Sequence, residues 1–324
     1  MNFPLPGRLV LAISLAALSG CTAPLHTAGS FQSAHPLPAS PAPGVAHAEG
    51  VIDGSGGVKL YEQSWRPAMA EPKAVLIIVH GLKDHSRRYA DPAIAAAQRG
   101  YAVYAFDLRG HGDSGGRRVR IHSFDEYLSD LDVFVAFVKS KEPGKPVFLF
   151  GHSMGGAITT LWTITRQPDL AGLLLSGPAL APGKDLPKAK ISATKMLSAL
   201  APTAHVLSLP DRNFSRDPAV VAEMKADPLV YHPGGAARTA AELLRAFERI
   251  GKDMDKVRVP LLIMHGTADK LTAPEGSKLL AEKASSKDKT LKLYDGYYHD
   301  LLHEPTKATV LGDMLGWLDA HAPK

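Results

Sequence analysis

A serine between two glycines carries the strongest chemical signal in this sequence, because residues 151–155 read Gly-His-Ser-Met-Gly. Residues 147–150 before it are apolar and aromatic, as in a buried strand, and apolar side chains recur after it at helical spacing. A serine at such a strand-to-helix turn adopts a strained backbone conformation that presents its hydroxyl at the edge of the sheet. The pattern therefore predicts that Ser153 is a nucleophile.

The serine needs two partners further along the chain. A serine hydroxyl is a weak nucleophile at neutral pH, so it requires a base, and the base requires a third group that orients it. Asp269 follows a strand-like run at residues 261–264, and His299 follows another at residues 291–294. Both come just after the C-terminal end of a strand, in the order serine, acid, histidine that this architecture uses. We expect Ser153, Asp269 and His299 to form a catalytic triad.

Other acidic and histidine residues near His299 offer alternatives for the acid and the base. Asp295 or Asp300 could replace Asp269 as the acid, and His303 could replace His299 as the base. Asp295 is too close to His299 in sequence to come from a separate strand, and His303 would lie one turn further into a helix. The spacing therefore favours Asp269 and His299.

The expected chemistry also requires two N–H donors for a developing oxyanion. The backbone amide of Met154 directly follows the nucleophile, and a second amide usually comes from a loop after an earlier strand. That loop is residues 80–85, so we expect the second donor to be Leu82. His80 and His85 could suggest a metal site, but a His-Gly pair after a central strand is more typical of an oxyanion turn. We expect neither a metal nor another cofactor.

Strand-like and helix-like segments alternate over most of the chain, which predicts an α/β fold with a mostly parallel central sheet and helices on both faces. An alternating segment at residues 58–66 is expected to add an antiparallel strand at the start. The other expected strands lie at residues 75–79, 101–106, 147–150, 173–175, 261–264 and 291–294, and the expected helices at 93–98, 123–139, 155–166, 277–282 and 307–321.

One interval breaks this alternation. Between residues 176 and 258 the sequence has Pro- and Gly-rich loops and amphipathic pieces, without a clear strand. An insertion here would lie above the C-terminal ends of the strands, where open α/β sheets bind ligands. We expect residues 177–257 to form a helical cap over the active site; the alternative is a set of helices that only adds packing.

Composition narrows the class of protein. The chain has 324 residues, of which 45% are hydrophobic and 21% charged, and a formal net charge of +5. Basic residues gather near positions 117–120 and 184–195, but no aromatic residues or nucleic-acid motif accompany them, so we interpret them as solvated faces and expect no nucleic-acid partner. The single cysteine excludes an intrachain disulfide.

That cysteine lies in a predicted targeting signal. Arg8 precedes an apolar run at residues 9–18, and Leu-Ser-Gly-Cys follows at 18–21. A helix of about ten residues spans roughly 15 Å, too short for the ~30 Å core of a bilayer, so the run is typical of a secretory signal. Its ending resembles the lipobox of bacterial lipoproteins, in which Cys21 would carry the lipid; an ordinary signal peptide is the alternative. Thr22, where inner-membrane lipoproteins have Asp, favours the outer membrane.

Several motifs together resemble those of a known family. They are residues 80–89, 106–114, 151–156, 227–230, 266–269 and 298–304, which include His-Gly-Leu-Lys-Asp-His-Ser-Arg-Arg-Tyr and Tyr-His-Asp-Leu-Leu-His-Glu. The pattern, over about residues 50–320, resembles monoacylglycerol lipases and lysophospholipases, which are α/β-hydrolases related to the serine aminopeptidase group. Lys83 departs from this pattern, because the family often has glycine there.

The resemblance implies an α/β-hydrolase fold with a hydrophobic cap, an acyl tunnel and no cofactor. It also implies a serine esterase that hydrolyses monoacylglycerols or similar single-chain lipid esters through an acyl-enzyme on Ser153. The alternatives are a lysophospholipase or a broad carboxylesterase, then a peptidase, and, in another class, a non-catalytic lipid-binding lipoprotein. With the signal at residues 1–21, the expected organisation is a disordered tether at 22–49 and an α/β-hydrolase domain at 50–324, anchored by lipid at a membrane surface of the bacterial cell envelope.

Overall fold

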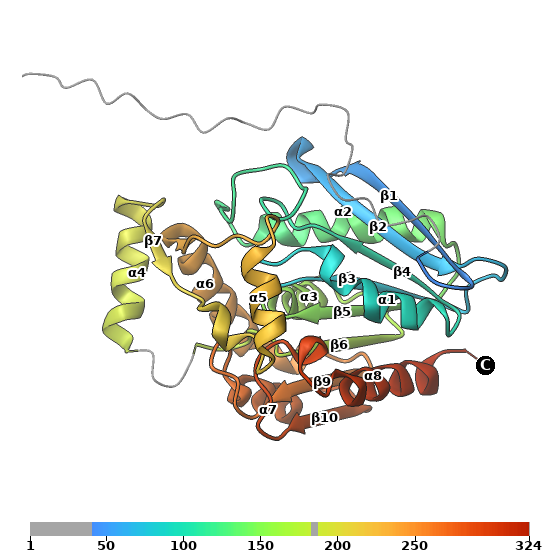
Figure 1. Ribbon diagram of the computed structural model, residues 1–324. Coiled ribbons are helices and arrows are strands. Elements are labelled where there is room, and N and C mark those ends of the chain that lie inside the picture. Colours follow the sequence, from blue (N-terminus) through green and yellow to red (C-terminus); the bar gives the residue numbers. More distant parts are fainter. Residues whose placement is uncertain (1–40, 183–186, 324) are drawn as a thin grey trace, which may run out of the picture.

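An eight-stranded sheet forms the centre of the molecule (Figure 1). The computed structural model describes residues 41–182 and 187–323, so the expected signal and Cys21 lie outside the described residues. The strand order is β1-β2-β4-β3-β5-β6-β9-β10; β2 runs antiparallel to β1 and β4, and all later neighbours are parallel. The strands are β1 (Val45–Asp53), β2 (Lys59–Pro67), β3 (Ala74–Val79), β4 (Tyr101–Phe106), β5 (Val147–His152), β6 (Gly172–Ser176), β9 (Leu261–Gly266) and β10 (Lys289–Tyr294).

Both faces of the sheet are covered, which confirms the expected α/β architecture. The central strand β3 is buried along its whole length, and its alternate side chains enter two separate cores. Val75, Ile77 and Val79 face one core, whereas Leu76 and Ile78 face the other. The first core includes side chains of α2 (Asp125–Lys141), α3 (Met154–Arg166) and α7 (Pro274–Lys283), and the second includes side chains of α1 (Ala90–Ala97) and α8 (Lys307–His321).

The sheet begins earlier than expected, at Val45. The tether was expected to extend to residue 49, but residues 45–49 belong to β1, which pairs with β2 along its length. Val45 is completely buried, and His47 Nε2 lies 3.2 Å from Gln63 Oε1. The strand carries Ala, His, Glu and Gly, so its composition resembles that of the preceding polar segment. Its pairing with β2 therefore cannot be recognised from composition.

The insertion between β6 and β9 contains two short strands that we did not expect. β7 (His205–Leu207) and β8 (Gly235–Ala236) pair antiparallel, and segments of three and two residues are too short to leave a periodic pattern. The insertion's helices are α4 (Lys188–Leu200), α5 (Pro218–Ala226) and α6 (Ala237–Asp253). The chain also has short 3-10 turns η1 (Ser55–Gly57), η2 (Ser86–Tyr89), η3 (Asp211–Asn213), η4 (Met254–Lys256) and η5 (Leu301–His303).

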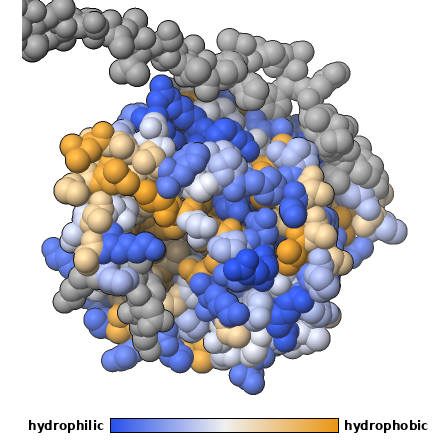
Figure 2. Space-filling view, turned by 60° about the vertical axis from the view of Figure 1, so that its left-hand side comes forward, coloured by the Kyte–Doolittle hydropathy of each residue, from blue (hydrophilic) through white to orange (hydrophobic). Residues whose placement is uncertain are grey.

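Two helices of the insertion, α4 and α6, differ in how they meet the domain. α6 packs against α3 and buries Ala246 and Ile250 in the core that α3 also lines. α4 stands at the outside of the molecule, against α6 (Figure 1). Met196 and Leu200 of α4 are 64% and 77% exposed, and Figure 2, with this side turned forward, shows apolar side chains gathered on the surface. In the described part of the chain, no helix is long and apolar enough to span a bilayer.

Candidate active site

Ser153 occupies a sharp turn between β5 and α3. Its backbone has φ 54° and ψ −120°, a conformation that costs a residue with a side chain about 1–3 kcal/mol. The flanking glycines are required by close packing: a Cβ on Gly155 would lie 2.1 Å from the carbonyl oxygen of Val79, and one on Gly151 would lie 2.3 Å from Oγ1 of Thr159. The two glycines thus let α3 approach the sheet closely enough to form the turn.

Asp269 and His299 come together in the loops that follow β9 and β10. His299 Nδ1 lies 2.7 Å from Asp269 Oδ2, and both side chains are almost completely buried. Burial alone lowers the pKa of His299, but the neighbouring Asp269 carboxylate outweighs it and raises the pKa above its ordinary value of 6.5. The same contact leaves His299 Nε2 as the ring nitrogen that is free of Asp269.

The Asp269 carboxylate is held by several further groups. Its Oδ1 accepts hydrogen bonds from the backbone amides of Leu271 at 2.7 Å and Thr272 at 3.0 Å. Its Oδ2 accepts one from Thr272 Oγ1 at 2.8 Å and lies 3.2 Å from His265 Nε2. Burial raises the pKa of Asp269, but the charge of His299 and the hydrogen bonds from His265 and His299 bring it well below its usual range.

Sequence reasoning missed His265 and Thr272 as partners of the acid. His265 is completely buried, and its second ring nitrogen, Nδ1, lies 2.7 Å from Ser277 Oγ, so both nitrogens have partners. The available signal was the spacing His265-Gly-Thr-Ala-Asp269, which places a histidine four residues before the acid at the end of a strand. Nothing in the sequence alone indicated that its ring would turn back to the carboxylate.

The loop after β6 brings Ser153 and His299 to the same edge of the sheet. The backbone amide of Ser153 donates to the carbonyl of Ser176 at 3.0 Å. The next residue, Gly177, packs against the histidine: a Cβ there would lie 3.2 Å from His299 Nδ1. In addition, the rings of His152 and His299 have centroids 4.7 Å apart. The nucleophile and the base therefore both lie next to this short segment.

The expected oxyanion loop passes directly beside the serine. A Cβ on Gly81 would lie 2.9 Å from the Cβ of Ser153 and 3.4 Å from its Oγ. His80 fixes this loop, because its Nδ1 lies 2.7 Å from the carbonyl of Gly81 and its Nε2 accepts a hydrogen bond from the amide of Leu108 at 2.9 Å. Leu82 is the next residue along the chain, so the loop that carries it lies beside the nucleophile. Across residues 41–182 and 187–323, no group of three His, Cys, Asp or Glu side chains could hold a metal ion.

The alternative acid and base residues have other partners. His303 Nδ1 lies 2.8 Å from Asp300 Oδ1, and Arg88 donates to Asp300 Oδ2 at 2.8 Å. Asp300 is deeply buried; burial raises its pKa, but His303 and Arg88 lower it well below its usual range. Asp295 is exposed and accepts a hydrogen bond from Thr267. Neither aspartate takes the place of Asp269 beside His299.

Arg88 also links this second pair to the oxyanion loop. Its Nη1 lies 3.6 Å from Asp84 Oδ1, and Tyr89 donates its hydroxyl to Asp84 Oδ2 at 2.9 Å. All of these side chains are mostly or completely buried. The loop after β3 and the loop after β10 are therefore joined by buried charges, a role for Asp84, Arg88 and Asp300 that sequence reasoning did not assign.

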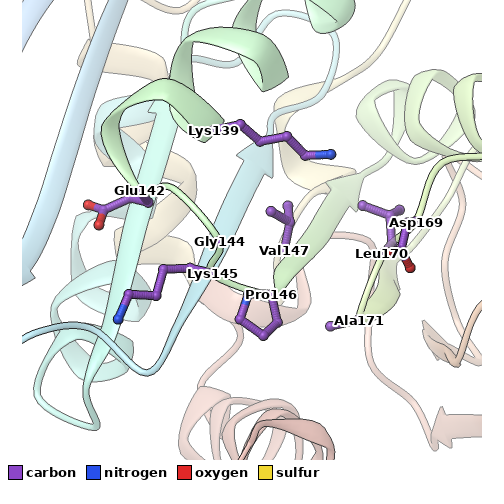
Figure 3. Close-up of a pocket in the computed structure, with 9 residues that line it drawn as sticks. All are labelled: Lys139, Glu142, Gly144, Lys145, Pro146, Val147, Asp169, Leu170 and Ala171. Carbon is purple, nitrogen blue, oxygen red and sulfur yellow. The ribbon is translucent and has the colours of Figure 1, made fainter.

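A cavity of about 470 Å³ lies at the opposite edge of the sheet (Figure 3). The cavity lies where β5 and β6 begin. The charged side chains that line it are Lys139, Glu142, Lys145 and Asp169. Since Ser153 follows the C-terminal end of β5, this cavity is separate from the candidate active site.

A serine at a strained strand-to-helix turn, a buried acid–histidine pair and a mostly parallel eight-stranded sheet define an α/β-hydrolase. Residues 70–306 match the family model described as serine aminopeptidase, S33, and the chain belongs to that family.

Relatives of known name are similar over most of the chain. A monoacylglycerol lipase of Mycolicibacterium smegmatis is 35% identical over 272 residues, which cover 83% of this chain and 95% of the relative. A caffeoylshikimate esterase of Arabidopsis thaliana is 36% identical and covers 82% of this chain and 83% of its own length. The crystal structure of Paleococcus ferrophilus monoacylglycerol lipase superposes with a TM-score of 0.72 at 31% identity, covering 81% of this chain and 99% of that one. This protein is thus a serine hydrolase that acts on ester bonds.

Proposed function

We propose that this protein hydrolyses monoacylglycerols or similar single-chain lipid esters through an acyl-enzyme on Ser153. The observation that carries the proposal is the buried Asp269–His299 pair, which lies at the same sheet edge as the strained turn of Ser153. The monoacylglycerol lipase of Mycolicibacterium smegmatis, similar over nearly its whole length, supports the choice of substrate.

The first half of the reaction forms the acyl-enzyme. Ser153 Oγ attacks the ester carbonyl carbon while His299 Nε2 accepts its proton, and Asp269 stabilises the resulting imidazolium through Nδ1. The amides of Leu82 and Met154 donate to the oxyanion, and the N-terminus of α3 adds its positive dipole there. His299 then returns the proton to the glycerol oxygen, so that the C–O bond breaks and the alcohol leaves.

The second half regenerates the serine. His299 takes a proton from a water molecule, whose oxygen attacks the acyl carbon of the ester on Ser153. Collapse of the second tetrahedral intermediate breaks the bond to Ser153 Oγ, which receives the proton from His299, and a fatty acid leaves. Apart from the ester and one water molecule, both halves use only groups of this chain.

The deciding experiment replaces the nucleophile and varies the substrate. Ser153→Ala is expected to lower kcat for monoacylglycerol hydrolysis by about 10⁴-fold or more while the circular dichroism spectrum is unchanged. Equal measurable turnover by the two forms would remove Ser153 as the nucleophile, and no turnover above background in either form would favour the non-catalytic lipid-binding alternative. A panel of monoacylglycerols, lysophospholipids, aromatic acid esters and amides then separates the lipase from a lysophospholipase, a broad carboxylesterase and a peptidase by their kcat/KM values.

We further propose that the protein is anchored by a lipid on Cys21 in the bacterial cell envelope, with the outer membrane favoured. The sequence Leu-Ser-Gly-Cys at residues 18–21 after an apolar run supports this, and Thr22 supports the outer membrane. Cys21→Ala is expected to move the protein from the membrane fraction to the soluble fraction and to abolish labelling by a fatty-acid probe. Unchanged membrane association and labelling would overturn the proposal.

A further inference from the structure

Lys83, beside the expected oxyanion donor Leu82, has an unusual environment. Its backbone lies in the left-handed region with φ 69°, which is unfavourable for a residue with a Cβ and comfortable for glycine. Its side chain is nevertheless 94% withdrawn from solvent, although a buried ammonium is costly unless it is paired. Both the backbone conformation and the burial of the ammonium are unfavourable for this lysine, so specific contacts must hold it in place.

Those contacts all reach into the insertion. Lys83 Nζ donates to the carbonyl of Leu209 at 3.0 Å and to Asp211 Oδ1 at 3.0 Å. The carbonyl of Lys83 accepts a hydrogen bond from the amide of Tyr231 at 3.1 Å. The loop that carries Leu82 is therefore joined to two separate segments of the insertion, by the side chain and by the backbone of one residue.

The segment that Lys83 holds, residues 209–214, also touches the catalytic histidine. The ring of Phe214 meets the ring of His299 edge to face, with centroids 5.6 Å apart and planes at 78°. The carbonyl of Phe214 accepts a hydrogen bond from the amide of Asp300 at 2.8 Å. The segment thus lies between the oxyanion loop and the loop of the general base.

We propose that Lys83 is a positioning residue that clamps residues 209–214 between these two loops and thereby holds the Leu82 amide and His299 in register for ester hydrolysis. The proposal rests on the proposed function of Ser153 and His299. Because the oxyanion and the imidazolium form only on the way to the transition state, the clamp acts on kcat more than on KM.

The left-handed backbone makes a sharp test available, since glycine accepts it without strain. Lys83→Gly removes the ammonium and leaves the backbone conformation favourable, so it is expected to stay folded. Its kcat is expected to fall about 10–100-fold, which is no more than the fall caused by removing an oxyanion donor. Its KM is expected to stay within about twofold of the wild-type value. Asp211→Asn is expected to lower kcat as well. The double variant is expected to be no slower than Lys83→Gly, because the two substitutions remove the same contact.

Two further variants separate positioning from a merely structural role. Lys83→Met and Lys83→Arg share the same backbone strain, but only arginine restores a cation opposite Asp211, so kcat is expected to recover in the arginine variant. Lys195→Met is the matched control: it removes the ion pair with Glu248 inside the same insertion and is expected to leave kcat unchanged.

The kinetics are measured with a monoacylglycerol and, in parallel, with a short p-nitrophenyl ester. Failure of the wild-type protein to hydrolyse the monoacylglycerol would count against the proposed substrate, while the aryl ester would still test the clamp. An unchanged kcat in Lys83→Gly, or equal kcat in the methionine and arginine variants, would overturn the role of Lys83. The role of Lys83 would also be overturned if kcat fell only in proportion to the amount of folded protein, as judged from Tm.

Discussion

At the scale of the residue, the mutual attraction of the acid and the base outweighs burial in setting their pKa values. Asp269 and His299 are both withdrawn from water, where a lone charge would be costly, and each stabilises the charge of the other. The pKa of His299 is therefore raised and that of Asp269 is lowered. His299 must be neutral to accept the proton of Ser153, and a raised pKa moves the neutral form to higher pH.

The first prediction concerns the acidic limb of the pH profile. The kcat/KM of the wild-type protein is expected to rise with pH through a midpoint above 6.5, where His299 loses its proton. Asp269→Asn removes the charge that raises this pKa, so its midpoint is expected at lower pH, and its kcat about 10⁴-fold lower because the imidazole loses its orienting acid. A midpoint in the variant at the same or higher pH would contradict this assignment.

From the sequence, Ser153, Asp269 and His299 could be chosen as candidates because each follows a strand and carries a reactive group. The sequence could not identify His265 and Thr272 as partners of Asp269, or Arg88 as a partner of Asp300. Their contacts with Asp269 and Asp300 depend on how side chains from separate turns meet in the folded protein. Neighbouring groups of that kind leave no periodic or spacing signal in the chain.

At the scale of the element, the position of Ser153 depends on how closely α3 approaches the sheet. The second prediction is that Gly155→Ala lowers stability by about 1–3 kcal/mol, because its Cβ would meet the carbonyl oxygens of Val79 and His80 at 2.1 and 2.5 Å. It is also expected to lower activity, since α3 and the turn must shift together. Urea unfolding and ester hydrolysis measure the two effects.

The matched control for this substitution is Gly312→Ala in α8. Gly312 is exposed and a Cβ there meets nothing within 4 Å, so alanine is expected to stabilise the helix by about 0.5–1 kcal/mol and leave activity unchanged. If Gly155→Ala were as stable and active as this control, close packing of α3 would not be what forms the turn.

Long elements with a clear period were predictable and short ones were not. The helix expected at residues 307–321 has those bounds in the structure, because its apolar side chains recur on one face. The strands of two and three residues at β8 and β7 were missed because alternation needs more residues to be seen. α5 was also missed; of its residues, only Met224 is buried.

At the scale of the whole molecule, the first strand belongs to the folded domain. The third prediction compares two truncated forms, one beginning at residue 41 and one at residue 50, where composition placed the boundary. The shorter form loses half of β1, including the buried Val45 and the contact of His47 with Gln63, and it exposes part of β2 as a free edge. We expect a lower Tm and more aggregation for the shorter form, by thermal melting and light scattering. Identical melting curves would instead place β1 outside the stable unit.

The insertion has an inner part, α6, and an outer part, residues 188–236. This division has a consequence for how relatives with the same fold can differ. α6 lines the same core as α3, so replacing it would disturb the layer on which the nucleophile turn depends. The β7–β8 pair ends at Ala236, one residue before α6 begins, and joins residues 205–207 to residues 235–236. A graft of residues 188–236 from a relative, joined just before α6 rather than at β9, would therefore keep that layer, but it would also have to supply partners for Lys83 and His299 at positions 209–214 and 231.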